Sequence, residues 1–313
     1  MSNIEIVSHI TKHSADLPVQ EPKRAGNIDE LISLVSFAND HPALGEHRWF
    51  VPSQLAHNDF VDFAAFDTDI LVGYAQLNGR SGTWSVETAV HPNYADVGTP
   101  SDAVAVKLLS AALEEIVAMG GGRVYYWVPK PTPFDDMLSD AAGFIHDRDL
   151  LQMRRALPLE DSIQRPHIQL KPFESEKDNS AWLEVNNKAF LTHPEQGGWT
   201  METLIERQSE PWFDAKGFLV YEQLGRLIGS CWTKIHSDQS PPLGEIYVVS
   251  VDPDYQGKGL GRQLTVAGLD WLTSRGLDTA MLYVDLTNEK ALNLYKSIGF
   301  IKDHTDRAYI KDV

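Results

Sequence analysis

One stretch of the chain, residues 244–262, constrains the fold more than any other. It reads GEIYVVSVDPDYQGKGLGR, an apolar run rich in β-branched residues, then a proline turn, then a glycine-spaced loop. β-Branched and aromatic residues favour a buried strand, and Pro253 ends that strand because proline cannot donate a hydrogen bond to the sheet. Helical periodicity begins at Gln263. The stretch therefore predicts a strand, a loop and a helix in succession.

The loop from Gln256 to Gly261 has the chemistry of an anion site. Gly259 and Gly261 allow backbone N–H groups to approach a ligand closely, and the following helix adds unpaired N–H donors and its positive dipole end. A diphosphate would suit this site. Two common glycine motifs are excluded, because neither Ser nor Thr follows Gly257-Lys258 in a Walker frame and G-x-G-x-x-G is absent.

This loop resembles the coenzyme A signature of the GNAT acetyltransferase superfamily, Gln/Arg-x-x-Gly-x-Gly/Ala after a strand that ends in Val-x-Pro. A second superfamily signature, Asn-x-x-Ala-x-x-x-Tyr-x-x-x-Gly-Phe, matches the sequence from Asn288 to Phe300. The resemblance implies an α/β (α+β) fold with a mixed, mostly antiparallel sheet flanked by helices. It also implies that the loop binds the pyrophosphate of coenzyme A.

The chain of 313 residues is long enough for two such folds. VHPNY at 90–94 matches VDPDY at 251–255, a separation of 251 − 90 = 161. Gly143-Phe144 matches Gly299-Phe300, a separation of 299 − 143 = 156. The similar separations indicate tandem copies of one fold. We therefore expect a first domain over 1–157, a linker over 158–166 and a second domain over 167–313.

Periodicity and turn residues predict a similar order of elements in both halves. In the first half we expect helices at 27–38, 103–119 and 134–142 and strands at 60–66, 70–77, 83–90, 124–128 and 150–157; residues 1–26 show no periodicity. In the second half we expect helices at 179–190, 263–274 and 289–298 and strands at 168–171, 218–221, 227–235, 245–251, 280–284 and 307–310.

The first copy differs where the coenzyme would bind. It continues as ADVGTP at 95–100, without the Gln and the second Gly of the signature. Asp96 adds negative charge and Pro100 removes an N–H donor. We expect this domain to be non-catalytic. It could bind coenzyme A weakly or serve as a scaffold, and the lost donors favour the scaffold.

Acyl transfer to an amine needs a group that takes the amine proton and a group that protonates the departing thiolate. Glu245 lies several residues before the phosphate loop, where a pantetheine arm would run, and we expect it to be the general base. The alternative is a solvated carboxylate at a strand end. Tyr295 is the expected acid; its alternative is packing on the helix face with Ala291 and Leu292.

Three segments resemble the mycothiol synthase family more narrowly: HPEQGGWT at 193–200, WTKIH at 232–236 and GEIY at 244–247. These tandem GNAT enzymes use acetyl-CoA to acetylate the cysteinyl amine of cysteinyl-glucosaminyl-inositol, the last step of mycothiol biosynthesis. The resemblance implies substrate contacts at Glu46, Glu195, Lys234, Glu245 and Tyr283. It implies coenzyme contacts at Val249, Ser250, Val251, Gln256, Gly257, Lys258, Gly259, Leu260, Gly261, Arg262, Asn288, Glu289, Lys290, Ala291, Leu292 and Asn293.

Chemistry agrees with this assignment, since carboxylates accept hydrogen bonds from sugar and inositol hydroxyls and favour a cationic amine. Two alternatives stay open: a tandem GNAT enzyme that acylates another small amine or a peptide N-terminus, and a non-enzymatic module that senses acyl-CoA. The presence of both Glu245 and Tyr295 favours an enzyme.

Composition limits the remaining possibilities. The formal charge of −17, from 27 basic and 44 acidic residues, opposes binding to nucleic acid or to anionic membranes. The lone Cys231 excludes an intrachain disulfide and has no ligand pattern around it, so we expect a buried small apolar side chain and no metal site. The sequence lacks a signal peptide and a long apolar run, and we expect a cytoplasmic monomer.

Overall fold

The computed structural model describes residues 4–11, 27–39, 44, 60–80, 82–95, 98–191, 196–237 and 239–313. The chain divides into two compact units, one formed by Met1–Asp149 with Thr305–Val313 and the other by Leu150–His304. These units differ from the sequence-based boundaries at two places. Residues 150–166 belong to the second unit, and residues 305–313 belong to the first.

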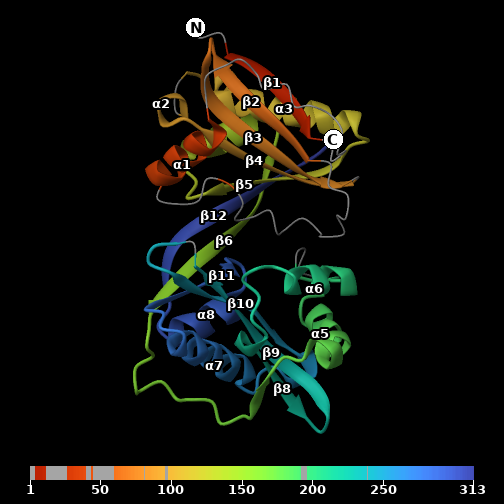
Figure 1. Ribbon diagram of the computed structural model, residues 1–313, viewed down its shortest axis with the longest axis vertical. Helices are drawn as coiled ribbons and strands as arrows, with labels where there is room; N and C mark the ends of the chain where they lie inside the picture. Colours follow the sequence, from red (N-terminus) through yellow and green to blue (C-terminus); the bar gives the residue numbers. More distant parts are fainter. Residues whose placement is uncertain are drawn as a thin grey trace. The chain divides into compact units, whose positions relative to one another are not determined.

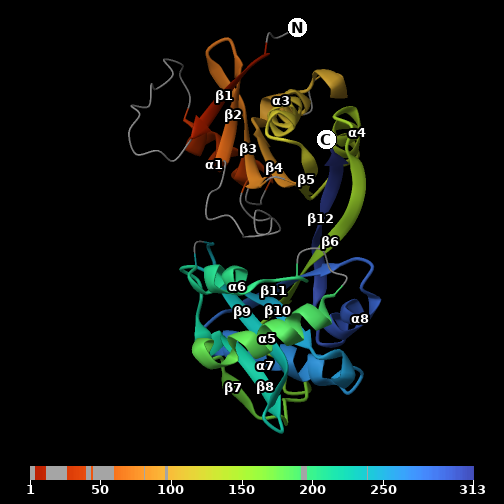
Figure 2. The same cartoon turned by 90° about the vertical axis from the view of Figure 1, so that its right-hand side faces the viewer.

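The first unit is a sheet with helices on both faces (Figures 1 and 2). Its strand order is β1-β2-β3-β4-β5-β12, and only the β4–β5 pair is parallel. Leu108 and Leu109 of α3 pack on one face, while Leu31 and Val35 of α1 pack on the other. Its elements are β1 (Ile4–Thr11), α1 (Ile28–Asn39), β2 (Phe60–Asp67), β3 (Ile70–Arg80), β4 (Gly82–Val90), α2 (Pro92–Ala95), η2 (Pro100–Asp102), α3 (Val104–Ala118), β5 (Gly122–Pro129), α4 (Pro133–Ala141) and parts of β6 (Ile145–Ala156) and β12 (Ile301–Asp312).

The second unit repeats this plan, with strand order β6-β11-β10-β9-β8-β7 and a parallel β10–β11 pair. α5 and α6 (green) cover one side of its sheet, and α7 and α8 (blue) cover the other (Figure 1). Its remaining elements are β7 (Leu170–Pro172), α5 (Ser175–Ala189), α6 (Met201–Gln208), η3 (Ala215–Gly217), β8 (Phe218–Gln223), β9 (Arg226–His236), β10 (Leu243–Val251), η4 (Pro253–Tyr255), α7 (Leu260–Ser274), β11 (Thr279–Asp285) and α8 (Glu289–Ser297).

Two long strands explain why the units do not follow the sequence halves. In the second unit β6 pairs with β11, from Leu150 opposite Asp285 to Ala156 opposite Thr279. In the first unit the last strand of the chain, β12, pairs with β5 over residues 306–312. Each unit therefore completes its sheet with a strand from the other half of the sequence.

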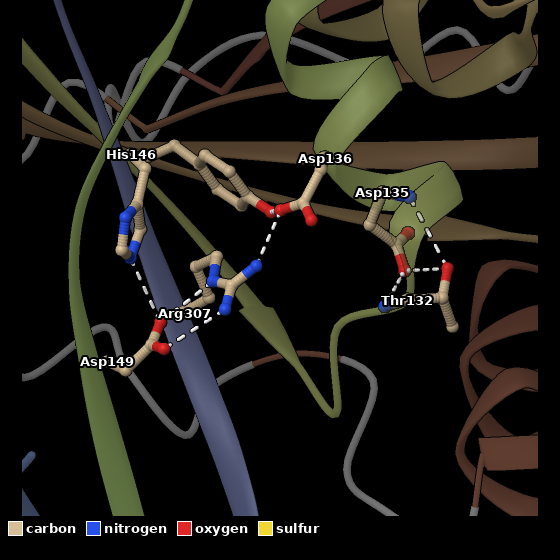
Figure 3. A network of polar contacts seen from close by, with 7 residues as sticks. Thr132, Asp135, Asp136, His146, Asp149 and Arg307 are labelled. Atoms are coloured by element: carbon tan, nitrogen blue, oxygen red, sulfur yellow. Dashed lines mark hydrogen bonds and ion pairs between the residues drawn. The ribbon is translucent and has the colours of Figure 1, made fainter.

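A network of charged side chains fastens β12 inside the first unit (Figure 3). Arg307 donates from Nε and Nη2 to the two oxygens of Asp149, at 2.7 and 3.0 Å, and from Nη1 to Asp136 at 2.6 Å. The Tyr309 hydroxyl donates to the same Asp136 oxygen at 2.5 Å, and His146 lies 3.0 Å from Asp149. We call these five residues the β12 clasp. The clasp joins the C-terminal strand to α4 and β6.

The expected fold class, a mixed and mostly antiparallel sheet flanked by helices in tandem, is confirmed. Several local expectations were wrong. Residues 4–11 form β1, α6 was not expected, and α7 begins at Leu260 instead of Gln263. Three further elements begin four to six residues earlier than expected: β6 at Ile145, α5 at Ser175 and β12 at Ile301. None of the helices within the described residues combines the length and apolar character needed to cross a membrane.

Candidate active site

The two central strands of the second unit separate in the middle of the sheet. β10 and β11 pair only at Gly244–Ala280 and Glu245–Met281. On its other edge β10 stays paired with β9, but the register shifts between Ile246 and Val248. A bulge increases local twist and redirects a strand. β10 therefore leaves β11 immediately after Glu245, as the family resemblance requires.

The expected coenzyme contacts on β10 lie beyond this separation point. Val249, Ser250 and Val251 are outside the β10–β11 ladder, so their backbone groups on that side are not used by β11. The Ser250 side chain is buried and its hydroxyl lies 2.8 Å from that of Ser230. Any contact between Ser250 and a ligand would therefore involve the backbone.

The glycine loop follows in an open conformation. Gly257 and Gly259 have φ values of +76° and +77°, a region that favours glycine. An added Cβ at either position would meet nothing within 4 Å. Gln256 donates its amide to the Val251 carbonyl at 3.1 Å, and the Lys258 ammonium lies 4.7 Å from the Tyr255 ring centroid. The loop is thus pinned to the strand end while its glycines remain uncovered.

Gly261 has a different setting, in the first turn of α7. An added Cβ there would meet only Leu294, at an ordinary 3.5 Å, so the folded chain does not require glycine. Glycine inside a helix costs up to about 1 kcal/mol relative to alanine. A helix N-terminus is suited to an anion, and glycine leaves room there for the coenzyme contact expected at Gly261. The neighbouring Leu260 is buried in the core and Arg262 is half-buried.

The second expected coenzyme segment forms the start of α8. The Asn288 side chain caps the helix by accepting a hydrogen bond from the backbone N–H of Ala291 at 3.1 Å. Leu292 is buried in the core. The expected contacts of this segment that are exposed are Asn288, Glu289, Lys290 and Asn293.

Tyr295 projects from α8 toward the core. The residue is half-buried, and its ring packs against Phe300 with centroids 5.9 Å apart. Burial, with a smaller effect from Cys231, raises the pKa of its phenol. The phenol therefore stays protonated at neutral pH, the form a general acid requires. Cys231 is fully buried, as expected, and burial raises the pKa of its thiol to about 12.

Glu245 is buried at the point where β10 and β11 separate. His236 Nε2 lies 2.8 Å from Glu245 Oε2, and Lys234 Nζ lies 3.9 Å from the same oxygen. Burial raises the pKa of Glu245, but the His236 hydrogen bond and the Lys234 charge outweigh burial, and the pKa is lowered. The carboxylate is therefore ionised at neutral pH. The solvated strand-end alternative is excluded by its burial.

Strand pairing explains this cluster. Lys234 lies directly opposite Glu245, and His236 lies opposite Leu243 on the same ladder. Residues two apart share one face of a strand, so Lys234 and His236 both flank the carboxylate. The Lys234 ammonium also lies 5.3 Å from the Trp212 ring centroid and 5.9 Å from that of Tyr247. Two aromatic rings thus hold the lysine beside Glu245.

Tyr283, the expected substrate contact on β11, belongs to a polar chain. Gln152 of β6 donates its amide N–H to the Tyr283 hydroxyl at 2.8 Å. Arg154 Nε donates to the Gln152 carbonyl oxygen at 2.7 Å and lies 3.5 Å from Asp303. The residues that orient Tyr283 therefore come from both long strands.

Two expected substrate contacts, Glu46 and Glu195, lie outside the described residues. His236 was missed by the sequence reasoning, although WTKIH had been singled out. The available signal was the alternation of Lys234 and His236 on a strand next to the one that carries Glu245. Across the described residues, three or more His, Cys, Asp or Glu side chains do not gather into a group that could hold a metal ion.

The first unit has different residues at the positions of the two candidate catalytic groups. The repeat separations give the corresponding positions. Glu245 corresponds to Trp84, since 245 − 161 = 84, and Tyr295 corresponds to Ser139, since 295 − 156 = 139. Both are buried, and the Trp84 indole donates to the Gly121 carbonyl at 3.0 Å. Neither residue can act as a general base of the Glu245 kind.

The central strands of the first unit also stay together for longer. β4 and β5 pair from Gly82 to Val86, and the Thr88 hydroxyl lies 3.0 Å from the Tyr126 hydroxyl. Ahead of α3, a 3₁₀ turn, Pro100–Asp102, stands where α7 has its glycines, and Ala103 and Val104 are buried. Gly98, which aligns with Gly259, keeps a positive φ of +89° and an uncovered Cβ position. In these described segments the first unit therefore differs in its longer β4–β5 pairing and in Pro100, which aligns with Gly261.

Comparisons with known proteins agree with this geometry. The family model described as the Acetyltransferase (GNAT) family matches residues 181–300. The mycothiol acetyltransferase of Acidimicrobium ferrooxidans is 42% identical over 286 residues, which cover 88% of this chain and 90% of that protein. The mycothiol acetyltransferase of Rhodococcus jostii is 35% identical over 297 residues, covering 92% and 95%.

Solved structures share the fold. A GCN5-related N-acetyltransferase from Sphaerobacter thermophilus superposes with a TM-score of 0.70 at 20% identity, covering 98% of this chain and 95% of that one. A tandem GNAT protein from the clavulanic acid biosynthesis pathway has a TM-score of 0.68 at 14% identity, covering 99% and 98%. At these identities the likeness concerns the fold alone.

The GNAT family match and the named relatives together define an acyltransferase of the GNAT class. Within that class, the chain belongs to the mycothiol acetyltransferase family.

Proposed function

We propose that the chain transfers the acetyl group of acetyl-CoA to the cysteinyl amine of cysteinyl-glucosaminyl-inositol, which completes mycothiol. The observation that carries this proposal is the ionised, buried Glu245 at the separation of β10 and β11. The glycine loop, where we propose that the coenzyme binds, follows Glu245 along the chain. We also propose that the chain acts in the cytoplasm and as a monomer.

The proposed reaction is direct attack in a ternary complex. The amine nitrogen forms a bond to the thioester carbonyl carbon, the carbon–sulfur bond breaks, and coenzyme A leaves as the thiolate. Glu245 takes the proton that the amine loses, and the Tyr295 phenol supplies a proton to the thiolate sulfur. An α-amine titrates near pH ~8, so a considerable minority is already neutral at neutral pH and a moderate base suffices.

The coenzyme would be held by the backbone. Open glycines at 257 and 259, room at Gly261 and the N-terminus of α7 suit a pyrophosphate, while the unpaired edge of β10 suits the amides of a pantetheine arm. Substrate contacts are proposed at Lys234 and Tyr283, with Glu46 and Glu195 assigned by resemblance.

We further propose that the first unit is a non-catalytic scaffold. Trp84 and Ser139 at the catalytic positions and the buried start of α3 support this role. A measurement of bound coenzyme A per chain tests it: one site supports the scaffold, and two would contradict it.

Mass spectrometry of the product tests the main proposal. Purified chain is incubated with acetyl-CoA and cysteinyl-glucosaminyl-inositol, and the N-acetylated glycoside is expected. Thiol-release dyes are unsuitable, because the glycoside carries its own thiol. Equal turnover of a simple amine or a peptide N-terminus without the inositol would point to a different acceptor, and coenzyme binding without any transfer would indicate a sensing module.

A further inference from the structure

The Glu245 carboxylate is contacted asymmetrically. His236 Nε2 lies 2.8 Å from Oε2 and Lys234 Nζ lies 3.9 Å from that same oxygen. Within the described residues, the hydrogen bond and both ion pairs of this carboxylate go to Oε2. An ionised carboxylate has lone pairs on both oxygens, so Oε1 keeps its capacity to accept a proton.

The two contacts are of different quality. A separation of 2.8 Å is an ordinary hydrogen-bond length, whereas 3.9 Å is at the limit of an ion pair and beyond hydrogen bonding. Lys234 is also shared with the rings of Trp212 and Tyr247. His236 is therefore the group that fixes the direction of the carboxylate. Because an ionised carboxylate can only accept, Nε2 must carry a proton.

Both partners are held in place. The His236 and Glu245 side chains are 11% and 8% exposed, so water competes weakly for this hydrogen bond. The two residues lie on paired strands, diagonal to each other across the β9–β10 ladder. Strand positions constrain side chains more tightly than loop positions do.

We propose that His236 is a positioning residue for acyl transfer: it holds Glu245 through Oε2, so that Oε1 is the oxygen that takes the proton of the acceptor amine. This inference rests on the proposed function in that it assumes Glu245 is the base. His236 itself touches neither acyl donor nor acceptor in this scheme. Its effect on rate passes entirely through Glu245.

A double-mutant cycle tests that dependence. The variants are His236→Leu, Glu245→Gln and the double variant, with kcat measured by product mass spectrometry at saturating substrates. We expect His236→Leu alone to lower kcat on the order of 10- to 100-fold, because the base loses its orientation. In the Glu245→Gln background the same change should cost less than about 2-fold. Equal losses in both backgrounds, or no loss in the parent, would overturn the proposal.

The pH profile gives a second readout that a merely structural role would not move. Loss of the donor raises the pKa of Glu245, so the acidic limb of kcat should shift to higher pH in His236→Leu. In His236→Gln, whose amide can still donate, the shift should be smaller. Lys234 and Tyr247 face the same region in both variants, so the difference reports the histidine. An unshifted limb in His236→Leu would contradict the proposal.

Two controls separate this inference from the proposed function. His167 is exposed in the same unit, and His167→Leu should leave kcat and its pH profile unchanged. If the parent fails to acetylate the glycoside, the proposed function fails first, and the cycle is run on whichever amine the parent acetylates. If the parent acetylates the glycoside but the cycle is additive, only the role of His236 fails.

Discussion

Single residues decide which proton each candidate group can move. The lowered pKa of Glu245 favours an ionised carboxylate, which can accept a proton. The raised pKa of Tyr295 favours a protonated phenol, which can donate one. Burial alone would have raised both values. The hydrogen bond from His236 and the charge of Lys234 reverse the outcome for Glu245. These directions agree with the proposed roles of Glu245 as base and Tyr295 as acid.

Replacing Tyr295 with Phe keeps the ring and its packing on Phe300 but removes the phenol. We expect kcat to fall by about 100-fold with an unchanged melting temperature, because the thiolate loses its proton source. Steady-state turnover and thermal unfolding on the same preparation check this. A Phe variant with full activity would leave Tyr295 a packing role alone.

At the scale of elements, the start of α7 should separate folding from ligand binding. A Cβ added at Gly261 meets only Leu294, at an ordinary 3.5 Å, so we expect Gly261→Val to unfold at nearly the parent temperature. Its side chain would occupy the space proposed for the pyrophosphate, and acetyl-CoA affinity should drop at least about 10-fold.

Calorimetry with each substrate checks this prediction. Gly261→Ala adds a smaller side chain, so its loss of acetyl-CoA affinity should be smaller than that of Gly261→Val. The affinity for the glycoside should stay constant in both variants. A folded Val variant with parental coenzyme affinity would exclude the loop as the pyrophosphate site.

The β12 clasp makes a prediction about stability. Arg307→Met should lower the free energy of unfolding of the first unit by about 2 kcal/mol, because Asp149 and Asp136 lose a charge-assisted partner. The matched control is Arg123→Met on the same strand pair. Arg123 and Asp312 are 49% and 67% exposed, and such pairs contribute about 0–1 kcal/mol. Equal losses in the two variants would contradict the clasp.

The clasp also has a pH dependence with a definite sign. The hydrogen bond from Tyr309, with Arg307, lowers the pKa of Asp136, and the hydrogen bond from Arg307 lowers that of Asp149. A carboxyl group whose pKa is lowered by folding stabilises the folded state at any pH above its pKa in the unfolded chain, about 4. This stabilisation is lost as the pH falls through the lower pKa of the folded state. Thermal unfolding should show the whole stability difference between the parent and Arg307→Met at neutral pH. The difference should become smaller as the pH is lowered into the acidic range. A constant difference would contradict this assignment.

Element boundaries show how far sequence reasoning reached. The glycine loop, Glu245 and Tyr295 were found because strand, turn and helix signals are local. The early part of β12, IKDHTD at 301–306, is polar, and only pairing with partners distant in sequence makes it a strand. α6 carried a local signal that was not used: Thr200 accepts a hydrogen bond from the Thr203 backbone N–H as an N-cap. His236 needed the register of β9 against β10, which no local pattern supplies.

For the whole molecule, the assignment of Glu46 rests on resemblance alone. Glu46→Ala should raise the Michaelis constant for the glycoside roughly 10-fold, the loss of about 1.5 kcal/mol expected for a charge-assisted hydrogen bond. Saturation curves for each substrate check this, with exposed Glu30→Ala as control. An effect on both curves, or on neither, would remove Glu46 from the substrate contacts.

The exchanged strands also set an order of events during synthesis. Residues 305–313 leave the ribosome only after the second unit, yet β5 of the first unit finds its antiparallel partner there, and Gly122 exchanges backbone hydrogen bonds with Val313 at 2.8 and 3.0 Å. The nascent first unit must therefore wait, with one side of β5 unpaired, while the whole second unit is translated. An unpaired strand edge is a template for wrong partners. A premature stop between the codons for the second unit and those for residues 305–313 would thus damage the part of the protein that was made first.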